Sequence, residues 1–424
     1  MNRVILHFDM NSYFAAVEQQ ANPSLRGRPV GIAATMAPGG CLIATSREAK
    51  AEGIVTGMRV RDGLEADPGL KIVEVDPPKY RSTTEAIFRI VAEYSEDIEP
   101  YSIDEAFVDL TGVVSSLKQG AQIGYEFQRR VKTEVGEWLT CSVGVTPTRW
   151  LAKFASDTAP KGGLVILNKA RLSGYLRGRP VTDAWGIAHG LKKRLGNLGI
   201  STLDQLQRYP VTNLIEVLGV KGYELWANVN GIELSGIMHE APPKSIGHSH
   251  VLRERTKNPV FHKSVLMKLC ERTARALRQK NMVANALWVA CRYAPAAHLR
   301  MNQGYAYSAR HKTDQGIYTA RRMFQILWSI IEKEIRGQVV TFLAVGTFRL
   351  RPVSGQMCIW QEPDVSKVEH IIDQVNQRYG AYLVQWGAMW GTRNHAQERI
   401  GFRKTIAASQ VMDDANTYKF VNDE

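Results

Sequence analysis

Three carboxylates at two points of the chain are the side chains best suited to chemistry. Asp9 follows a short β-favouring run, and Asp104 with Glu105 stands between two further strand-like runs at 101–103 and 106–110. If these strands are neighbours in one sheet, the carboxylates converge, and converging carboxylates repel one another unless a cation lies among them. Hard oxygen ligands suit Mg²⁺, and two such ions about 3.5–4 Å apart serve phosphoryl transfer. An Asp-Glu pair is also common at exposed turns, and the spacing alone leaves that alternative open.

The hydrophobic pattern predicts the elements that would position these carboxylates. A strand at 4–8 is followed by a helix from Tyr13, and apolar residues at Ile87, Ile90, Val91 and Tyr94 indicate an amphipathic helix that ends near Pro100. The two strand-like runs come next, then a helix at 125–139, a strand at 141–145 and a helix opened by Pro147. The order β-α-β-β-α-β is that of a split βαβ unit of the ferredoxin-like kind, so the fold class is α+β.

Two further segments have their own character. About sixty residues between the first strand and the first long helix are rich in Gly and Pro and hold a short helix around 46–52, which predicts an inserted subdomain. From 169 to 233, short helices alternate with glycine turns, as in helix-hairpin-helix modules that present backbone N–H groups to phosphate. Glycines that only cap helices would give the same pattern, so this segment has two interpretations.

The positive charge of the chain is concentrated in one segment. The formal net charge is +13, and residues 246–352 contain 19 Lys and Arg against 5 Asp and Glu, while the rest of the chain is nearly neutral. An excess of this size within one domain predicts a polyanionic partner such as nucleic acid. A solvated basic face without a specific partner is the alternative.

Composition excludes several classes of protein. The chain of 424 residues predicts two to four domains, and no apolar run reaches the ~18 residues of a membrane span. A charge follows only five uncharged residues after Arg3, so we expect no export signal, no membrane and a cytoplasmic location. The cysteines form no CxxC pair, which argues against a zinc ribbon or a disulfide framework; they are Cys41, Cys141, Cys270, Cys291 and Cys358.

The residue order within several short motifs narrows the choice of functional class. Four strings occur in order: Phe8-Asp-Met-Asn-Ser-Tyr-Phe-Ala-Ala-Val-Glu18, Gly27-Arg-Pro-Val30, Ala44-Thr-Ser-Arg-Glu-Ala-Lys-Ala-Glu-Gly53 and Tyr101-Ser-Ile-Asp-Glu-Ala-Phe-Val-Asp-Leu-Thr-Gly112. With Ser142-Val-Gly-Val145, Leu151-Ala-Lys-Phe-Ala-Ser-Asp157 and Ser245-Ile-Gly-His-Ser-His250, they closely resemble the Y-family (translesion) DNA polymerases over residues 1 to about 352. The segment at 43–50 departs from the wording of the DinB branch, so the closest resemblance is to the bacterial UmuC-like branch.

The resemblance implies roles for the residues of the site. Asp9 and Asp104 would bind both of two Mg²⁺ ions, with Glu105 and the Met10 carbonyl as further ligands. Phe14 falls at the steric gate, whose ring would collide with a ribose 2′-hydroxyl, and Tyr13 would lie beneath the incoming dNTP. Arg47 and Lys50 align with side chains that touch the triphosphate. Pro160-Lys161 reverses the usual Lys-Pro, so Lys161 is either the later triphosphate lysine or that lysine is missing.

The resemblance also implies a right-hand architecture with a grip on primer-template DNA. The expected domains are a palm at 1–12 and 79–168, fingers at 13–78, a helix-hairpin-helix thumb at 169–233, a linker at 234–245, a little finger at 246–352 and a C-terminal tail at 353–424. The side chains expected to contact DNA are Lys192, Lys193, Arg253, Arg255, Lys257, Arg321 and Arg322.

The tail contains a candidate docking motif. Gln356-Met-Cys-Ile-Trp360 resembles the pentapeptide with which bacterial polymerases bind the sliding clamp, with Gln356, Ile359 and Trp360 as anchors; an edge strand packed on the little finger is the alternative. A UmuD-like accessory subunit is a further partner that the branch allows. An amphipathic helix is expected at 368–379, with no indication of what it contacts.

The expected function is therefore low-fidelity, template-directed translesion synthesis from dNTPs by a two-metal mechanism, in DNA damage tolerance. A catalytically inactive DNA-binding scaffold of the same fold is the main alternative, and the intact carboxylates argue against it. Another palm-type nucleotidyl enzyme, such as a cyclase, is a third class. The hairpins and the basic segment argue against a cyclase, which has no duplex to hold.

Overall fold

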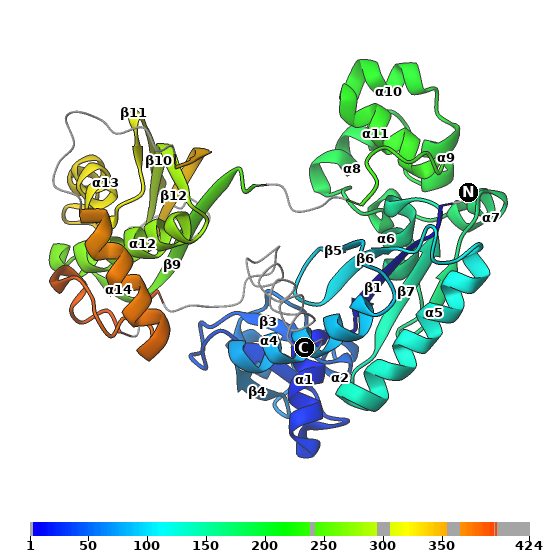
Figure 1. The fold of residues 1–424 in the computed structure, drawn as a ribbon, viewed down its shortest axis with the longest axis horizontal. Coiled ribbons are helices and arrows are strands. Elements are labelled where there is room, and N and C mark those ends of the chain that lie inside the picture. Colours follow the sequence, from blue (N-terminus) through cyan, green and yellow to red (C-terminus); the bar gives the residue numbers. More distant parts are fainter. Residues whose placement is uncertain (1–2, 238–241, 295–305, 354–364, 394, 397–424) are drawn as a thin grey trace, which may run out of the picture. The chain divides into compact units, whose positions relative to one another are not determined.

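The computed structural model describes residues 3–237, 242–294, 306–353, 365–393 and 395–396. The chain divides into two compact units, called unit 1 (described residues up to 237) and unit 2 (described residues 242–396). Figure 1 shows the elements of both units. No helix among these residues is both long enough and apolar enough to cross a bilayer.

A five-stranded sheet forms the centre of unit 1. Its strand order is β5-β6-β1-β7-β8, and central β1 is antiparallel to both neighbours. The strands are β1 (Ile5–Met10), β5 (Ile98–Pro100), β6 (Glu105–Asp109), β7 (Cys141–Thr146) and β8 (Leu164–Ile166). The helices that pack on this sheet are α4 (Pro77–Ala92), α5 (Leu117–Arg130) and α6 (Arg149–Thr158). The predicted α+β class is confirmed.

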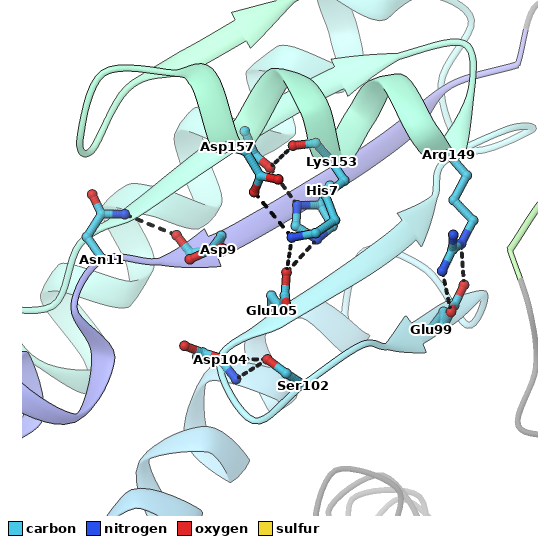
Figure 2. Close-up of polar contacts among 11 residues, drawn as sticks. His7, Asp9, Asn11, Glu99, Ser102, Asp104, Glu105, Arg149, Lys153 and Asp157 are labelled. Atoms are coloured by element: carbon cyan, nitrogen blue, oxygen red, sulfur yellow. Dashed lines mark hydrogen bonds and ion pairs between the residues drawn. The ribbon is translucent and has the colours of Figure 1, made fainter. Parts of the chain in front are cut away.

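Side chains of β1 alternate between two differently covered faces of the sheet, as the pleat requires. The ring of Phe8 contacts Phe88 of α4 and Phe127 of α5, with centroids 5.9 and 4.7 Å apart. His7 points to the other face, where α6 lies and Ser156 Oγ is 2.7 Å from His7 Nδ1. Asp9 shares the face of His7, so the end of β1 directs a carboxylate toward α6 (Figure 2).

Three predicted boundaries are wrong. The helix expected at 125–139 is α5 (Leu117–Arg130), followed by a π-helical turn, η2 (Val131–Val135). The strand expected at 101–103 is β5 at Ile98–Pro100, and residues 101–104 form the turn into β6, with Tyr101 N donating to Glu105 O at 3.0 Å. Pro100 is tolerated in β5 because this is an edge strand, where a missing N–H donor costs little. The helix expected to end near Pro100 ends at Ala92.

A second, smaller sheet in unit 1 belongs to the expected insert. The strand order is β3-β2-β4, and a small apolar core lies behind it. Helix α2 forms where a short helix was predicted, since the Ser46 side chain caps it by accepting from Ala49 N. The elements of this segment are α1 (Tyr13–Ala21), η1 (Pro23–Leu25), β2 (Val30–Ala33), β3 (Leu42–Thr45), α2 (Arg47–Ala51), α3 (Val60–Ala66) and β4 (Lys71–Glu74).

The last part of unit 1 is helical, as the glycine-punctuated pattern predicted. Gly199 and Gly219 have φ of 75° and 64°, and both stand directly after or between short helices, where only glycine adopts this conformation without strain. The elements are α7 (Lys169–Leu176), η3 (Val181–Asp183), α8 (His189–Gly196), α9 (Leu203–Arg208), α10 (Val211–Leu218) and α11 (Val220–Val229).

Unit 2 is a four-stranded antiparallel sheet with helices on one face. The strand order is β11-β10-β12-β9, and α12 and α13 pack on the sheet and on each other around one apolar core (Figure 1). The elements are β9 (Ser245–Thr256), α12 (Pro259–Gln279), β10 (Met282–Tyr293), β11 (Ala306–Ile317), α13 (Ala320–Ile335) and β12 (Val340–Pro352).

A C-terminal segment completes unit 2. The helix expected at 368–379 is α14 (Val365–Tyr379), and it is followed by the short helix η4 (Gly387–Met389). Both lie against α12: Arg278 Nε donates to Asp373 at 2.7 Å, Lys268 Nζ donates to Thr392 O at 2.8 Å, and Met389 is fully buried. The C-terminal segment therefore packs on α12 of unit 2, a contact that the sequence did not indicate.

Candidate active site

The sheet brings the three predicted carboxylates to one place. Asp9, at the end of β1, is paired in register with Glu105, the first residue of β6, and Met10 N donates to Asp104 O at 3.0 Å. Asp9, Met10 and Asp104 line a cavity of about 280 Å³. Its other walls are Asn11, Ser12, Tyr13, Phe14, Ile43, Ala44, Thr45, Lys50, Thr56, Ser102, Ile103 and Lys161.

Three polar or cationic side chains hold these carboxylates apart. Figure 2 shows Glu105 directed toward α6, where Lys153 Nζ is 2.5 Å and His7 Nε2 is 3.3 Å from its Oε2. Asp104 instead accepts a hydrogen bond from the Ser102 hydroxyl. Accordingly, no three His, Cys, Asp or Glu side chains in the described ranges already stand close enough together to hold a metal ion.

The three carboxyl groups differ in charge because their surroundings differ. Burial raises the pKa of Asp9 to about 8, and the nearby carboxylates of Asp104 and Glu105 add to the effect. Burial also raises the pKa of Asp104 to about 6, although the Ser102 hydrogen bond opposes the shift. For Glu105, burial is outweighed by His7 and by the charge of Lys153, which lower its pKa to about 2.

Lys153 is the cation that makes this difference. Burial opposes its charge, but the carboxylates of Glu105 and Asp157 outweigh that effect and raise the pKa of Lys153. Asp157 lies one turn further along α6, 3.2 Å from Lys153 Nζ. Lys153 and Asp157 are spaced i,i+4 in the sequence, and this spacing indicates that they share one face of a helix.

The two aromatic residues at the start of α1 form the floor of the cavity. The Tyr13 hydroxyl donates to Tyr80 O at 2.9 Å and lies 2.8 Å from Thr84 Oγ1, both on α4. The ring of Phe14 stacks on Tyr80 with centroids 4.5 Å apart and is 8% exposed. Both side chains thus serve packing and line the cavity.

Two lysines also line the cavity. Lys50, on α2, donates from Nζ to Ser12 Oγ at 2.8 Å, and Lys161 lines the same cavity from the turn after α6. Burial lowers the pKa of Lys50, and the charge of Lys161 lowers it further, so the two ammonium groups lie close enough to interact. Arg47 is exposed on α2 and does not line the cavity; its contact with a triphosphate stays a prediction.

The residues predicted to contact DNA occupy exposed positions where their side chains are described. Lys192 and Lys193 lie on α8 in unit 1, Arg255 and Lys257 lie on and just after β9, and Arg321 with Arg322 opens α13. Arg253 is on β9. The predicted clamp anchors Gln356, Ile359 and Trp360 lie outside the described residues.

Sequence reasoning missed two residues beside the carboxylates. Asn11 is buried directly after β1, and its side chain contacts Asp9 O, Ser142 Oγ and Gly162 N. Ser142 lies opposite Asp9 in the register of β1 and β7. No spacing pattern in the sequence links Asn11 to residue 162.

Comparisons with known proteins agree with this geometry. The family model described as impB/mucB/samB matches residues 8–157, and the model of that family's C-terminal domain matches residues 243–357. DNA polymerase IV 1 of Bacillus subtilis is 29% identical over 415 residues, covering 95% of this chain and 97% of the relative. DNA polymerase IV of Methanoculleus marisnigri is 32% identical over 295 residues, covering 69% of this chain and 81% of the relative.

A solved structure shares the fold. A Y-family DNA polymerase chimera of Dbh and Dpo4 superposes with a TM-score of 0.71 at 21% identity, covering 82% of this chain and all of the chimera. The chain belongs to the impB/mucB/samB family, and its fold is that of the Y-family DNA polymerases. The closer likeness to the UmuC-like branch stays a prediction.

Proposed function

We propose that this DNA-directed DNA polymerase copies damaged templates with low fidelity, in DNA damage tolerance. The observation that supports this most directly is the cavity lined by Asp9 and Asp104, beside Glu105, together with two lysines and the aromatic side chains of Tyr13 and Phe14. Carboxylates and ammonium groups in one cavity suit a nucleoside triphosphate with its metal ions.

The donor set fits divalent cations. Asp9 and Asp104 are half-buried, and the loss of solvent has raised the pKa of both, so Lys153 alone does not supply enough positive charge to keep the three carboxyl groups ionised. We propose that Asp9, Asp104, Glu105 and the Met10 carbonyl hold two Mg²⁺ ions. Bound there, the ions would neutralise phosphate charge and lower the pKa of the attacking hydroxyl.

The protein's own side chains would select and orient the nucleotide. The Phe14 ring is fixed against Tyr80 and leaves little room at the position proposed for a ribose 2′-hydroxyl. Lys50 and Lys161 would bind phosphate oxygens, with Arg47 nearby on α2. Ala44 and Thr45 of β3 give this part of the cavity small side chains, which favours tolerance of distorted bases.

Primer-template DNA would be held by both units. In unit 1, α8 offers Lys192 and Lys193 at exposed positions in the middle of the helix, and in unit 2 the exposed basic side chains of β9 and α13 belong to the segment with 19 basic and 5 acidic residues. Phosphate contacts of this kind give binding that weakens steeply with salt. A sliding clamp, bound through Gln356, Ile359 and Trp360, and a UmuD-like accessory subunit complete the proposed partners.

Primer extension on damaged and undamaged templates tests the proposal. With Mg²⁺ the protein should extend primers past a lesion, and Glu105→Ala should reduce extension by more than about a hundredfold while DNA binding is kept, because Glu105 is not one of the basic side chains that would contact phosphate. Glu96→Gln, an exposed carboxylate of the same unit, is the matched control and should leave extension unchanged. Extension by Glu105→Ala within tenfold of the unmodified protein would contradict the assignment, and a protein that binds DNA without extending primers would be a scaffold.

A further inference from the structure

The turn that contains Lys161 departs from the sequence typical of the family, because Pro160-Lys161 reverses the usual Lys-Pro order. Pro160 O accepts from Gly163 N at 2.8 Å, and Gly162 has φ of 74°, so residues 160–163 form a β-turn of the type that requires glycine at its third position. Lys161 therefore stands at the second position of the turn. Its place in the cavity depends on what holds this turn.

A single buried side chain connects the turn to the carboxylate strand. Asn11 is 5% exposed, and its Oδ1 accepts from Gly162 N at 2.8 Å. Its Nδ2 donates to Asp9 O at 3.1 Å and to Ser142 Oγ at 3.2 Å. Ser142 Oγ in turn donates to Pro160 O at 3.3 Å, and the β7 backbone holds the last residue of the turn, since Val143 N donates to Gly163 O at 2.9 Å.

The orientation of the Asn11 amide follows from these partners. Gly162 N can only donate and Asp9 O can only accept. If the amide were reversed, Nδ2 would face the donor Gly162 N and Oδ1 would face the acceptor Asp9 O. Asn11 is thus a bridge with a fixed polarity, between the backbone of a metal-binding residue and the backbone beside a phosphate-binding lysine. Alanine at this position would leave Gly162 N without its side-chain acceptor.

Few other contacts in the described ranges fix the position of the Lys161 side chain. Its side chain is exposed, and within the described ranges it has no carboxylate at ion-pair distance. On the outer side, Gln128 Nε2 contacts Gly162 O and Gly163 O at 3.2 Å each, but Gln128 lies on α5 and makes no contact with Asp9. Within the described ranges, Asn11 is thus the side chain that links the peptide group beside Lys161 directly to Asp9, while the β7 backbone holds the end of the turn.

We propose that Asn11 is a positioning residue for the nucleotide, because its amide sets Lys161 at a fixed distance from Asp9 and so restores the triphosphate contact that the reversed Pro-Lys order would otherwise misplace. The proposal rests on the proposed dNTP site. Asn11 itself need not touch the nucleotide, and its effect should pass through Lys161.

A double-mutant cycle separates this role from a general loss of structure. Primer extension is measured for the unmodified protein, Asn11→Ala, Lys161→Ala and the double variant, with kcat and KM for dNTP determined separately. Each single variant should raise KM about tenfold, which is about 1.4 kcal/mol of binding, and Asn11→Ala should change KM less than about twofold when Lys161 is already alanine. The Mg²⁺ concentration for half-maximal rate should stay the same in all four proteins.

Matched measurements make every outcome decisive. Asn230→Ala removes an amide that contacts two backbone carbonyls far from the site, and it should leave KM unchanged. Additive effects on KM, or a shift in the Mg²⁺ dependence with Asn11→Ala, would overturn the proposal, because Asn11 would then act on Asp9. If the unmodified protein extends no primer, the proposed function itself fails. If Lys161→Ala alone raises KM and Asn11→Ala does not, only the positioning role fails.

Discussion

Lys153 gives the three carboxylates of the site their different charges. It lies 2.5 Å from Glu105 and keeps that group ionised, whereas Asp9 has no comparable cation and its pKa rises to about 8. A carboxyl group whose pKa is raised in the folded protein favours the folded state most at low pH, and this stability is lost as the pH rises through the folded pKa. The metal-free site is thus a source of instability at neutral and higher pH.

This leads to a prediction about Asp9. In a chelator-containing buffer, the free energy of unfolding should fall between pH 5 and pH 8.5, because the folded-state pKa values of Asp9 and Asp104 are about 8 and about 6. Asp9→Asn should stabilise the metal-free protein at pH 8.5 by at least about 1 kcal/mol, the equivalent of roughly one pKa unit, and flatten the pH dependence. Denaturant unfolding monitored at several pH values measures both. A pH profile of Asp9→Asn identical to that of the unmodified protein would contradict this account.

Phe14 allows a second prediction at the same scale. Replacing it with alanine should admit ribonucleotides, because the lost ring opens the cavity without touching a carboxylate. The measurement is kcat/KM for dNTP and for rNTP, and the ratio between them should shift by at least about tenfold toward rNTP. Tyr80→Leu is the control, since it removes the stacking partner of Phe14 and leaves the ring in the cavity wall. An equal shift in both variants would mean that loosened packing, and not a steric gate, causes the change.

At the scale of elements, the close packing of α6 on the sheet helps to fix the geometry of the site. A Cβ on Gly144 of β7 would lie 2.1 Å from Ala152 O, so only glycine lets α6 approach the sheet closely enough for Lys153 to contact Glu105. The sequence allowed the strand order and the three carboxylates to be predicted, because apolar periodicity and motif wording are local. Asn11, whose partner is 151 residues away at Gly162, could not be predicted, because hydrogen bonds across the sheet leave no periodic signal.

The C-terminal helix α14 shows the same limit and supports a prediction. Its pattern indicated a helix, but the buried side is polar: Glu369 and Asn376 are buried while Val368 and Ile371 are exposed, so hydropathy could not reveal which side faces α12. Met389, just beyond, is fully buried against unit 2, and Trp390 is 81% exposed. Met389→Ala should destabilise unit 2 by about 2–4 kcal/mol, whereas Trp390→Ala should change its stability by less than about 0.5 kcal/mol. Hydrogen exchange of α12 and α14 in the full chain measures both, and equal effects of the two variants would mean that the segment does not complete the unit.

At the scale of the whole molecule, the cavity and most of the excess basic charge belong to different units of the chain. The carboxylates, the aromatic floor and the lysines of the cavity all lie in unit 1, while unit 2 holds most of the excess basic charge. Phosphate contacts weaken as the salt concentration rises, so we expect the protein to release DNA readily at physiological salt. A tether to another DNA-bound protein would then raise the effective concentration at the primer end without changing the chemistry.

The predicted clamp motif is the segment suited to such a tether. It follows Pro352, where β12 ends, and precedes α14, so it connects two elements that belong to the same unit. Replacing Gln356, Ile359 and Trp360 with alanine should leave unassisted synthesis within about twofold of the unmodified protein and should abolish stimulation by a loaded sliding clamp, because a short anchor contributes binding and no catalysis. Primer extension with and without clamp measures this, and the exposed Trp390→Ala is the matched control for loss of an indole. Equal loss of activity in the absence of clamp would mean that the three residues support the fold of unit 2, and stimulation that persists in the triple variant would place the tether elsewhere on the chain.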